Sequence, residues 1–242
     1  MTWRWIPPLQ AGGRRQMALD RWMLQQQAEP GATPMLRLYR WSRPTLSLGA
    51  HQQRLEPHWP ELVAAGVIEL VQRPSGGRAV LHAGDLTYAL ACRPASRHRL
   101  EAYTQACRWL QAAFADLGLP LQIGATTAAQ AQRSSSCFAS GTAADLIHPQ
   151  GAKRIGSAQL WRGPALLQHG SVLVEPAADL WQRVFGEAPP QLPPLPCSPA
   201  ELEQRLRVAA TQHLCDGEIQ DQPLTSAEWQ AVQALEQQLA AG

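Results

Sequence analysis

The stretch Arg73–Tyr88 (RPSGGRAVLHAGDLTY) constrains the fold more than any other part of the sequence. Two adjacent glycines, Gly76 and Gly77, precede a short apolar run, Ala79–Leu81, that leads to His82. A glycine within extended backbone costs conformational entropy and contributes no packing, so a close approach by another main chain or by a ligand would explain the pair. A glycine β-bulge in an ordinary hairpin is the alternative. The pair alone does not choose between these interpretations.

The composition is that of a globular protein. The 242 residues suit one large domain, or one domain with an appendage, and 45% are hydrophobic while 17% are charged. A formal net charge of +2 is too small to indicate nucleic-acid binding. No apolar run approaches the ~20 residues of a membrane span, and the N-terminus lacks the apolar segment of a signal peptide. We therefore expect a cytoplasmic protein whose partners include neither nucleic acid nor a membrane.

The cysteines indicate a reducing compartment. They are odd in number and widely spaced, and no C-x-x-C motif occurs, so neither a zinc site nor a dithiol motif is indicated. We expect no metal and no cofactor. The five are Cys92, Cys107, Cys137, Cys197 and Cys215.

Helical and alternating patterns are interspersed along the chain. Apolar spacing predicts helices over 17–27, 55–66 (broken near Pro60), 100–117, 180–185, 200–214 and 226–240. Strands are predicted over 35–41, 44–49, 67–71, 79–81, 86–92, 121–123, 145–148, 153–160 and 165–175. This mixed order, with several hairpin-like pairs, predicts an α+β fold with a mixed, mostly antiparallel sheet flanked by helices.

Six prolines in residues 188–199 (APPQLPPLPCSP) indicate an extended linker. The predicted organisation is a main domain over 1–187, this linker, and a C-terminal helical extension over 200–242. Ser198 and Ser226 are candidate helix starts.

Standard nucleotide-binding loops and the G-x-S-x-G and H-E-x-x-H motifs are absent. What remains is a set of separate residues. Cys137 follows serines, and a loop cysteine near a lysine or histidine can be a thiolate. Lys153 precedes a G-S-A-Q segment, although a lysine in such a place is usually a surface charge. His82 and His169 are candidates for general bases or for hydrogen-bonded structural groups.

Together the motifs have a familiar order. From about Trp5 to Glu175 the chain resembles the biotin/lipoate A/B protein ligase family, and within it the cysteine-dependent octanoyltransferases. The segments that carry the resemblance are Met17–Asp20, Pro44–Gly49, Arg73–His82, Leu86–Tyr88, Ser135–Phe138, Lys153–Gln159 and Leu167–Ser171.

The resemblance implies a mechanism. Cys137 would attack the thioester of octanoyl-acyl carrier protein, and a lysine of a lipoyl domain or of the glycine cleavage H protein would take the octanoyl group from the acyl-enzyme as an amide. Lys153 would bind the acyl carbonyl and favour the Cys137 thiolate. The implied substrate-binding residues are Arg73, Ser75, Gly76, Gly77, Arg78, His82, Gly156, Ser157, Ala158, His169 and Gly170. Basic residues near Arg93–Arg99, with Arg108, would meet acidic carrier proteins.

Three positions depart from the family pattern: Gln72 replaces a second arginine before Arg73, Ala83 replaces an aspartate after the histidine, and Ala144–Asp145 replaces a Tyr-Glu pair. Two other functions stay open. In an ATP-dependent lipoate ligase, Lys153 would bind an adenylate phosphate and Cys137 would be incidental. A non-catalytic protein that binds lipoyl domains or acyl carriers would have kept the fold and lost turnover.

Overall fold

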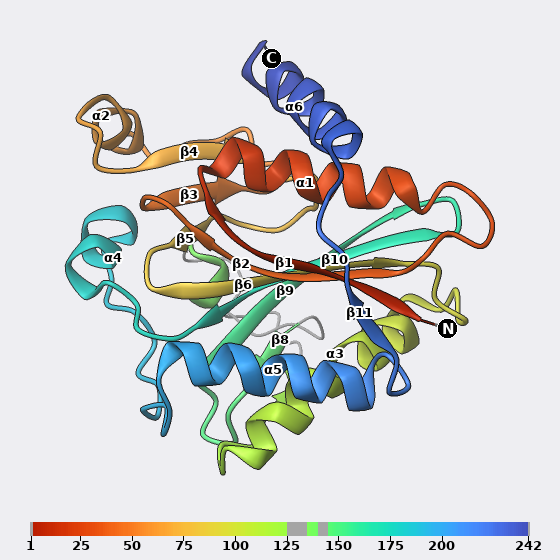
Figure 1. Ribbon diagram of the computed structural model, residues 1–242. Helices are drawn as coiled ribbons and strands as arrows, with labels where there is room; N and C mark the ends of the chain where they lie inside the picture. Colours follow the sequence, from red (N-terminus) through yellow and green to blue (C-terminus); the bar gives the residue numbers. More distant parts are fainter. Residues whose placement is uncertain (1, 125–134, 140–144, 242) are drawn as a thin grey trace.

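The computed structural model describes residues 2–124, 135–139 and 145–241. Its centre is an eight-stranded sheet in the order β11-β1-β2-β6-β10-β9-β8-β7 (Figure 1). Neighbouring strands are antiparallel except at one side, where β1 is parallel to both β2 and β11. The strands are β1 (Trp3–Ala11), β2 (Met35–Trp41), β6 (Asp85–Cys92), β7 (Gln122–Ile123), β8 (Asp145–Ile147), β9 (Lys153–Arg162), β10 (Ala165–Leu173) and β11 (Ile219–Asp221).

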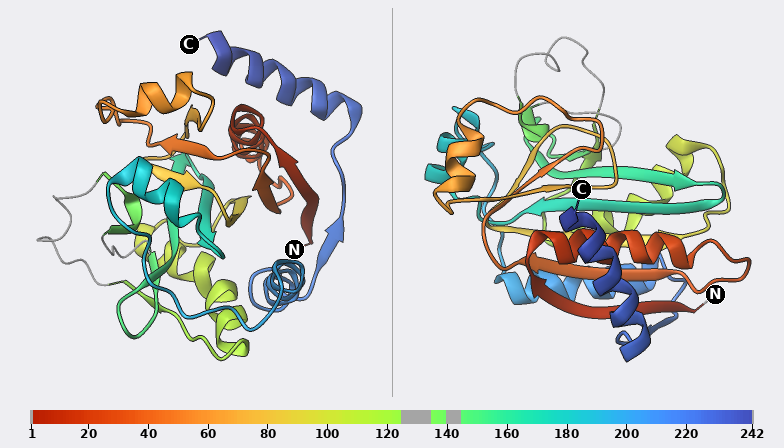
Figure 2. Two further views of the ribbon diagram at one scale, coloured as in Figure 1. Left: turned by 90° about the vertical axis from the view of Figure 1, so that its left-hand side faces the viewer. Right: turned by 90° about the horizontal axis from the view of Figure 1, so that it is seen from above.

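Helices cover both faces of this sheet (Figures 1 and 2). On one face α1 (Gly13–Gln26) packs beside α6 (Ser226–Ala241), and on the other α3 (Arg99–Asp116) packs beside α5 (Pro199–His213). Each layer buries its own apolar cluster against the sheet, because alternate side chains of a strand point to opposite faces. The predicted α+β class, with a mostly antiparallel sheet flanked by helices, is confirmed.

A second, three-stranded sheet lies beside the first. Its order is β4-β3-β5, with β3 (Thr45–Leu48) in the middle, parallel to β4 (Glu69–Gln72) and antiparallel to β5 (Val80–His82). Two short helices, α2 (Trp59–Ala64) and α4 (Ala178–Phe185), flank it and bury Trp59 and Trp181 in a third apolar cluster. The sequence patterns predicted these strands but not their separation into a sheet of their own.

Proline explains two differences between the expected and the observed elements. Pro60 lies in the first turn of α2, where its missing N–H is not needed, so it begins the helix instead of breaking it. The strand β1 was not predicted because Pro7 and Pro8 interrupt its pattern; the pairing of β1 with β2 shifts register between Ile6 and Leu9.

The C-terminal residues pack against the rest of the chain. Ser198 caps α5 in a capping box with Glu201, as expected for a helix start, whereas the side-chain cap of α6 is Thr225, one residue before Ser226. Helix α5 supplies Leu202 and Leu206 to the same cluster as the main sheet. The division at residues 187 and 199 stays a prediction about folding units. Within the described ranges, no helix is both long enough and apolar enough to cross a membrane.

Candidate active site

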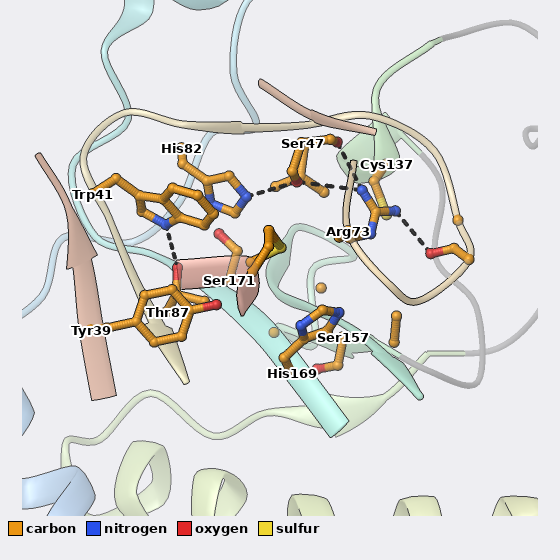
Figure 3. Close-up of a pocket in the computed structure, with 17 residues that line it drawn as sticks. Tyr39, Trp41, Ser47, Arg73, His82, Thr87, Cys137, Ser157, His169 and Ser171 are labelled. Atoms are coloured by element: carbon orange, nitrogen blue, oxygen red, sulfur yellow. Dashed lines mark hydrogen bonds between the residues drawn. The ribbon is translucent and has the colours of Figure 1, made fainter. Parts of the chain in front are cut away.

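A narrow cavity of about 60 Å³ lies between the two sheets and α1 (Figure 3). Residues that the sequence singled out converge on it from segments far apart in the chain. Of that set, Arg73, Gly76, Gly77, His82, Cys137, Gly156, Ser157, Ala158, His169 and Gly170 line the cavity. The remaining three lie in direct contact with lining residues: Lys153 with Cys137, Ser75 with His169, and Arg78 with Arg73.

Cys137 begins a short 3-10 turn, and its N–H donates to the carbonyl of Ala79 at 2.9 Å. The Nζ of Lys153 lies 3.5 Å from the Cys137 Sγ and donates to the Cys137 carbonyl at 2.6 Å. Lys153 also pairs with Asp145 at 2.9 Å, and the side chains of both are at most 3% exposed. A buried ionisable group requires a polar partner, so Asp145 holds the Lys153 side chain beside the thiol.

Two glycines in the central strands make room for this arrangement. A Cβ on Gly156 would lie 2.9 Å from Lys153 Cε and 3.3 Å from the ring of Phe138. The ammonium lies 4.9 Å from the centroid of that same ring. A Cβ on Gly170 would lie 2.6 Å from the Ser157 Oγ. Larger residues at either glycine would displace the side chains that surround the thiol.

The glycine pair that opened the sequence argument lies in an irregular loop, not in a strand bulge. Another main chain approaches it: a Cβ on Gly49 would lie only 1.9 Å from the Gly77 carbonyl oxygen. Gly77 has a φ of +101°, a conformation that favours glycine. Both Gly76 and Gly77 also line the cavity. The loop therefore packs against the Gly49 main chain and also forms part of the cavity wall.

One buried guanidinium holds this loop. Arg73 donates to the carbonyls of Ser47 at 2.8 Å, Gly76 at 2.9 Å and Arg78 at 2.6 Å. Burial lowers the pKa of Arg73, and the nearby Cys137 thiolate opposes that effect. Arg73 therefore shapes the loop and places a positive charge on the cavity wall near the thiol.

His82 lies in a chain of buried polar contacts. Its Nδ1 lies 2.7 Å from Asp85 Oδ2, and its Nε2 lies 2.9 Å from Ser47 Oγ. The ring stacks on Trp41 with centroids 4.0 Å apart. Trp41 in turn donates to the Thr87 hydroxyl at 2.8 Å, so this ring plane is fixed from several sides (Figure 3).

His169 has a parallel arrangement. Its Nε2 lies 2.5 Å from Ser75 Oγ, and its Nδ1 lies 2.7 Å from Asp20 Oδ2. Asp20 also pairs with Arg37 at 2.6 Å, and both side chains are at most 1% exposed. Burial alone would raise the pKa of Asp20, but the charge of Arg37 and the hydrogen bond from His169 outweigh it and lower the pKa.

Sequence reasoning missed the partners that organise the site. The carboxylates Asp20, Asp85 and Asp145 each hold a cation or imidazole in place. Asp85, three residues after His82, is the carboxylate that contacts its imidazole, whereas Ala83 offers none. Asp145 was noted only for its departure from the family pattern; its neighbour Ala144 lies outside the described residues.

The comparisons place the chain in a family. Residues 13–220 match the model of the lipoyl protein ligase A/B catalytic domain. The chain belongs to that family.

Two proteins named octanoyltransferase LipM are similar to this chain over most of its length. The chain is 36% identical over 225 residues to octanoyltransferase LipM from Carboxydothermus hydrogenoformans, a match that covers 91% of this chain and 78% of the relative. It is 34% identical to octanoyltransferase LipM from Moorella thermoacetica, covering 72% of this chain and 65% of the relative. The name octanoyltransferase denotes an acyltransferase, and this chain is an enzyme of that class.

A solved structure of the family shares the fold. Lipoate-protein ligase A bound with ATP superposes with a TM-score of 0.80 at 19% identity, covering 98% of this chain and 95% of that one. At this level of identity the likeness concerns the fold alone. Among the described residues, no cluster of His, Cys, Asp and Glu has a metal-binding arrangement.

Proposed function

We propose that the protein is an octanoyltransferase of lipoate biosynthesis that works through a thioester on Cys137. The single observation that carries the proposal is the contact of the Cys137 thiol, on the wall of a narrow cavity, with the buried Lys153–Asp145 ion pair. A cation at this distance favours the thiolate, which is the nucleophilic form of cysteine. The choice of an octanoyl group rests on the name of the relatives, octanoyltransferase LipM.

In the first half-reaction the Cys137 thiolate attacks the carbonyl carbon of an octanoyl thioester on acyl carrier protein. The carbon–sulfur bond to the carrier breaks, and the acyl group is left as a thioester on Cys137. One thioester replaces another, so the exchange is nearly isoenergetic and needs no ATP. The Lys153 ammonium, held by Asp145, stabilises negative charge on sulfur and on the acyl oxygen.

In the second half-reaction a lysine amine of a lipoyl domain or of the glycine cleavage H protein attacks the acyl-enzyme. An amide forms and the thiolate is regenerated. The exposed basic residues Arg97, His98, Arg99 and Arg108 would contact acidic carrier proteins by charge complementarity. Arg93 is less free for this role, because its guanidinium donates to the carbonyls of Gln27 and Ala28.

The two rival functions have less support. A ligase would also use Lys153, to bind an adenylate phosphate, so what favours the thioester route is the Cys137 sulfur 3.5 Å from the Lys153 Nζ, a contact that an incidental cysteine would not need. A non-catalytic binding protein would have no need to keep the buried Lys153–Asp145 pair. The Asp145 carboxylate, in the segment where the sequence departs from the family, is part of the pair.

One experiment separates the three functions. The protein is incubated with octanoyl-acyl carrier protein and its intact mass is measured, wild type beside Cys137→Ala. Transfer to a lipoyl domain is then followed from octanoyl-acyl carrier protein, and separately from free octanoate with and without ATP. An octanoyl adduct on the wild type alone supports the proposal. Transfer that requires ATP and survives Cys137→Ala indicates a ligase, and absence of both adduct and transfer indicates a binding protein.

A further inference from the structure

Lys153 is unsuited to one step that the proposed function requires. When an amine attacks a thioester, its nitrogen must lose a proton, and a nearby base speeds this step. An ammonium has three N–H donors, and those of Lys153 face the Cys137 carbonyl, the Cys137 sulfur and Asp145. Lys153 is therefore a fixed cation, and the proton acceptor has to be another group on the cavity wall.

His82 has the geometry of such an acceptor. Asp85 Oδ2 accepts from Thr87 at 3.1 Å and from Ser171 at 2.7 Å, and it lies 2.7 Å from His82 Nδ1. Because Oδ2 is the acceptor of both hydroxyls, His82 Nδ1 is assigned as a donor to it, and Nε2 then has the lone pair. Ser47 Oγ, which accepts from Arg73 at 3.4 Å, is oriented to donate its own proton to Nε2.

His169 is the competing candidate, and the carboxylate behind it is shared with a buried cation. The carboxylate behind it, Asp20, forms a fully buried ion pair with Arg37, whose positive charge offsets the charge that would stabilise an imidazolium. In the described part of the chain, no Lys or Arg side chain forms an ion pair with Asp85. His82 is therefore the histidine of the two whose carboxylate is not shared with a buried arginine.

We propose, on the basis of the proposed function, that His82 is the general base of the second half-reaction. The neutral amine of the acceptor lysine forms a bond to the acyl carbon of octanoyl-Cys137. As the carbon–sulfur bond breaks, its electron pair stays on the Cys137 sulfur beside Lys153. The amine proton passes to the Ser47 hydroxyl while the proton of Ser47 passes to His82 Nε2. The imidazolium, paired with Asp85, then releases that proton to solvent.

The other charged groups around His82 are cationic and set back from its ring. Arg73 faces it through the Ser47 hydroxyl, and Arg40 and Arg43 line a neighbouring pocket on which His82 and Asp85 also border. Trp41 covers one face of the ring. Asp85 is the carboxylate in direct contact with His82. Its charge can therefore be removed by substitution while the imidazole is kept.

The test begins from a preformed acyl-enzyme. Octanoyl-Cys137 protein is isolated and mixed in a single turnover with a lipoyl domain or with hydroxylamine, a nucleophile that is largely uncharged at neutral pH and needs no base. For His82→Gln we expect the rate of transfer to the lipoyl-domain lysine, divided by the hydroxylamine rate of the same acyl-enzyme, to fall about 100-fold or more relative to wild type. Raising the pH should recover part of that loss, because hydroxide then takes the proton that the attacking amine has to lose. The exposed His51 supplies the control, and His51→Gln should match wild type.

Each remaining outcome has a meaning. A ratio of the lysine rate to the hydroxylamine rate in His82→Gln within about threefold of wild type would overturn the inference and leave the proposed function standing. So would a selective loss in His169→Gln alone. Failure of the wild type to form the Cys137 adduct would overturn the proposed function itself. If His82→Gln does not load, Asp85→Asn keeps the imidazole; it should lower the ratio of the lysine rate to the hydroxylamine rate at least tenfold, and a wild-type ratio would reject the assignment.

Discussion

The Lys153 ammonium lies 2.9 Å from the Asp145 carboxylate and 3.5 Å from the Cys137 sulfur. The ion pair is nearly inaccessible to solvent, so its two charges depend on each other for stability. The same cation therefore has two separable effects, one on the fold and one on the chemistry of the thiol.

Replacement of this lysine should affect both. In Lys153→Ala the Asp145 carboxylate is left buried without its ion-pair partner, so we expect the free energy of unfolding to fall by about 3–5 kcal/mol and acyl transfer to fall at least 100-fold. The double variant Lys153→Ala/Asp145→Asn should regain most of the stability but none of the activity. Urea unfolding and single-turnover transfer measure the two effects. Equal recovery of both in the double variant would contradict the assignment.

The contact between Gly49 and Gly77 predicts a matched pair of variants. In Gly49→Ala the new Cβ would meet the Gly77 carbonyl at 1.9 Å, so the glycine loop must move and we expect a loss of several kcal/mol in stability. Gly76→Ala places its Cβ in open space and should unfold at the wild-type temperature. Thermal unfolding followed by circular dichroism measures both, and similar midpoints for the two variants would show that the loop tolerates displacement.

Acid should loosen the contact between α6 and the N-terminal strand. The hydrogen bond from Arg4 lowers the pKa of Glu228 to about 2. A pKa that is lower in the folded state stabilises the protein above the unfolded value of about 4.5, and this contribution is lost as the pH falls toward 2. Because Glu228 is partly exposed, the effect should be small. Glu228→Gln should destabilise the protein at pH 7 but not at pH 2. An equal difference at both pH values would refute the linkage.

Loss of the buried ion pair between Asp20 and Arg37 should lower the free energy of unfolding more than loss of the partly exposed pair between Arg4 and Glu228. Asp20→Asn leaves the Arg37 guanidinium without its carboxylate and His169 without its acceptor, so we expect a loss of about 3–5 kcal/mol at neutral pH. Because the pKa of Asp20 is lowered in the folded state, its contribution to stability is present above the unfolded pKa of about 3.8 and is lost as the pH falls. Denaturant titrations at pH 7 and pH 3 test this; a loss of under 1 kcal/mol at pH 7 would contradict it.

Sequence patterns predicted those parts of the fold that are governed by local periodicity. The strand Met35–Trp41 has the limits that its alternation indicated, and the helix over 100–117 is displaced by a single residue at each end. The strand Trp3–Ala11 was missed, because its prolines hide a pairing that depends on strands distant in the sequence. A three-residue strand such as Ile219–Asp221 carries too little pattern to be recognised alone.

The same limit applies to the site. Cys137, Lys153 and the glycine loop could be singled out, because each lies in a short motif of unusual composition. The residues that hold them, Asp20 and Asp145 among them, are single carboxylates whose role depends on which side chains the fold brings within 3 Å. No local signal distinguishes such an aspartate from one on a solvated surface.

The parallel pairing of β11 with β1 has a consequence for aggregation. Residues Ile219–Asp221 cover one side of β1, which would otherwise be the outer strand of the main sheet. An uncovered strand presents unpaired N–H and C=O groups that can pair with another molecule. Pro7 and Pro8 block such pairing in the middle of β1, but Trp3–Trp5, the segment that β11 covers, precedes them. A chain shortened before residue 219 should therefore self-associate through its first strand. The short strand β11 thus protects the β1 edge from pairing with a strand of another molecule.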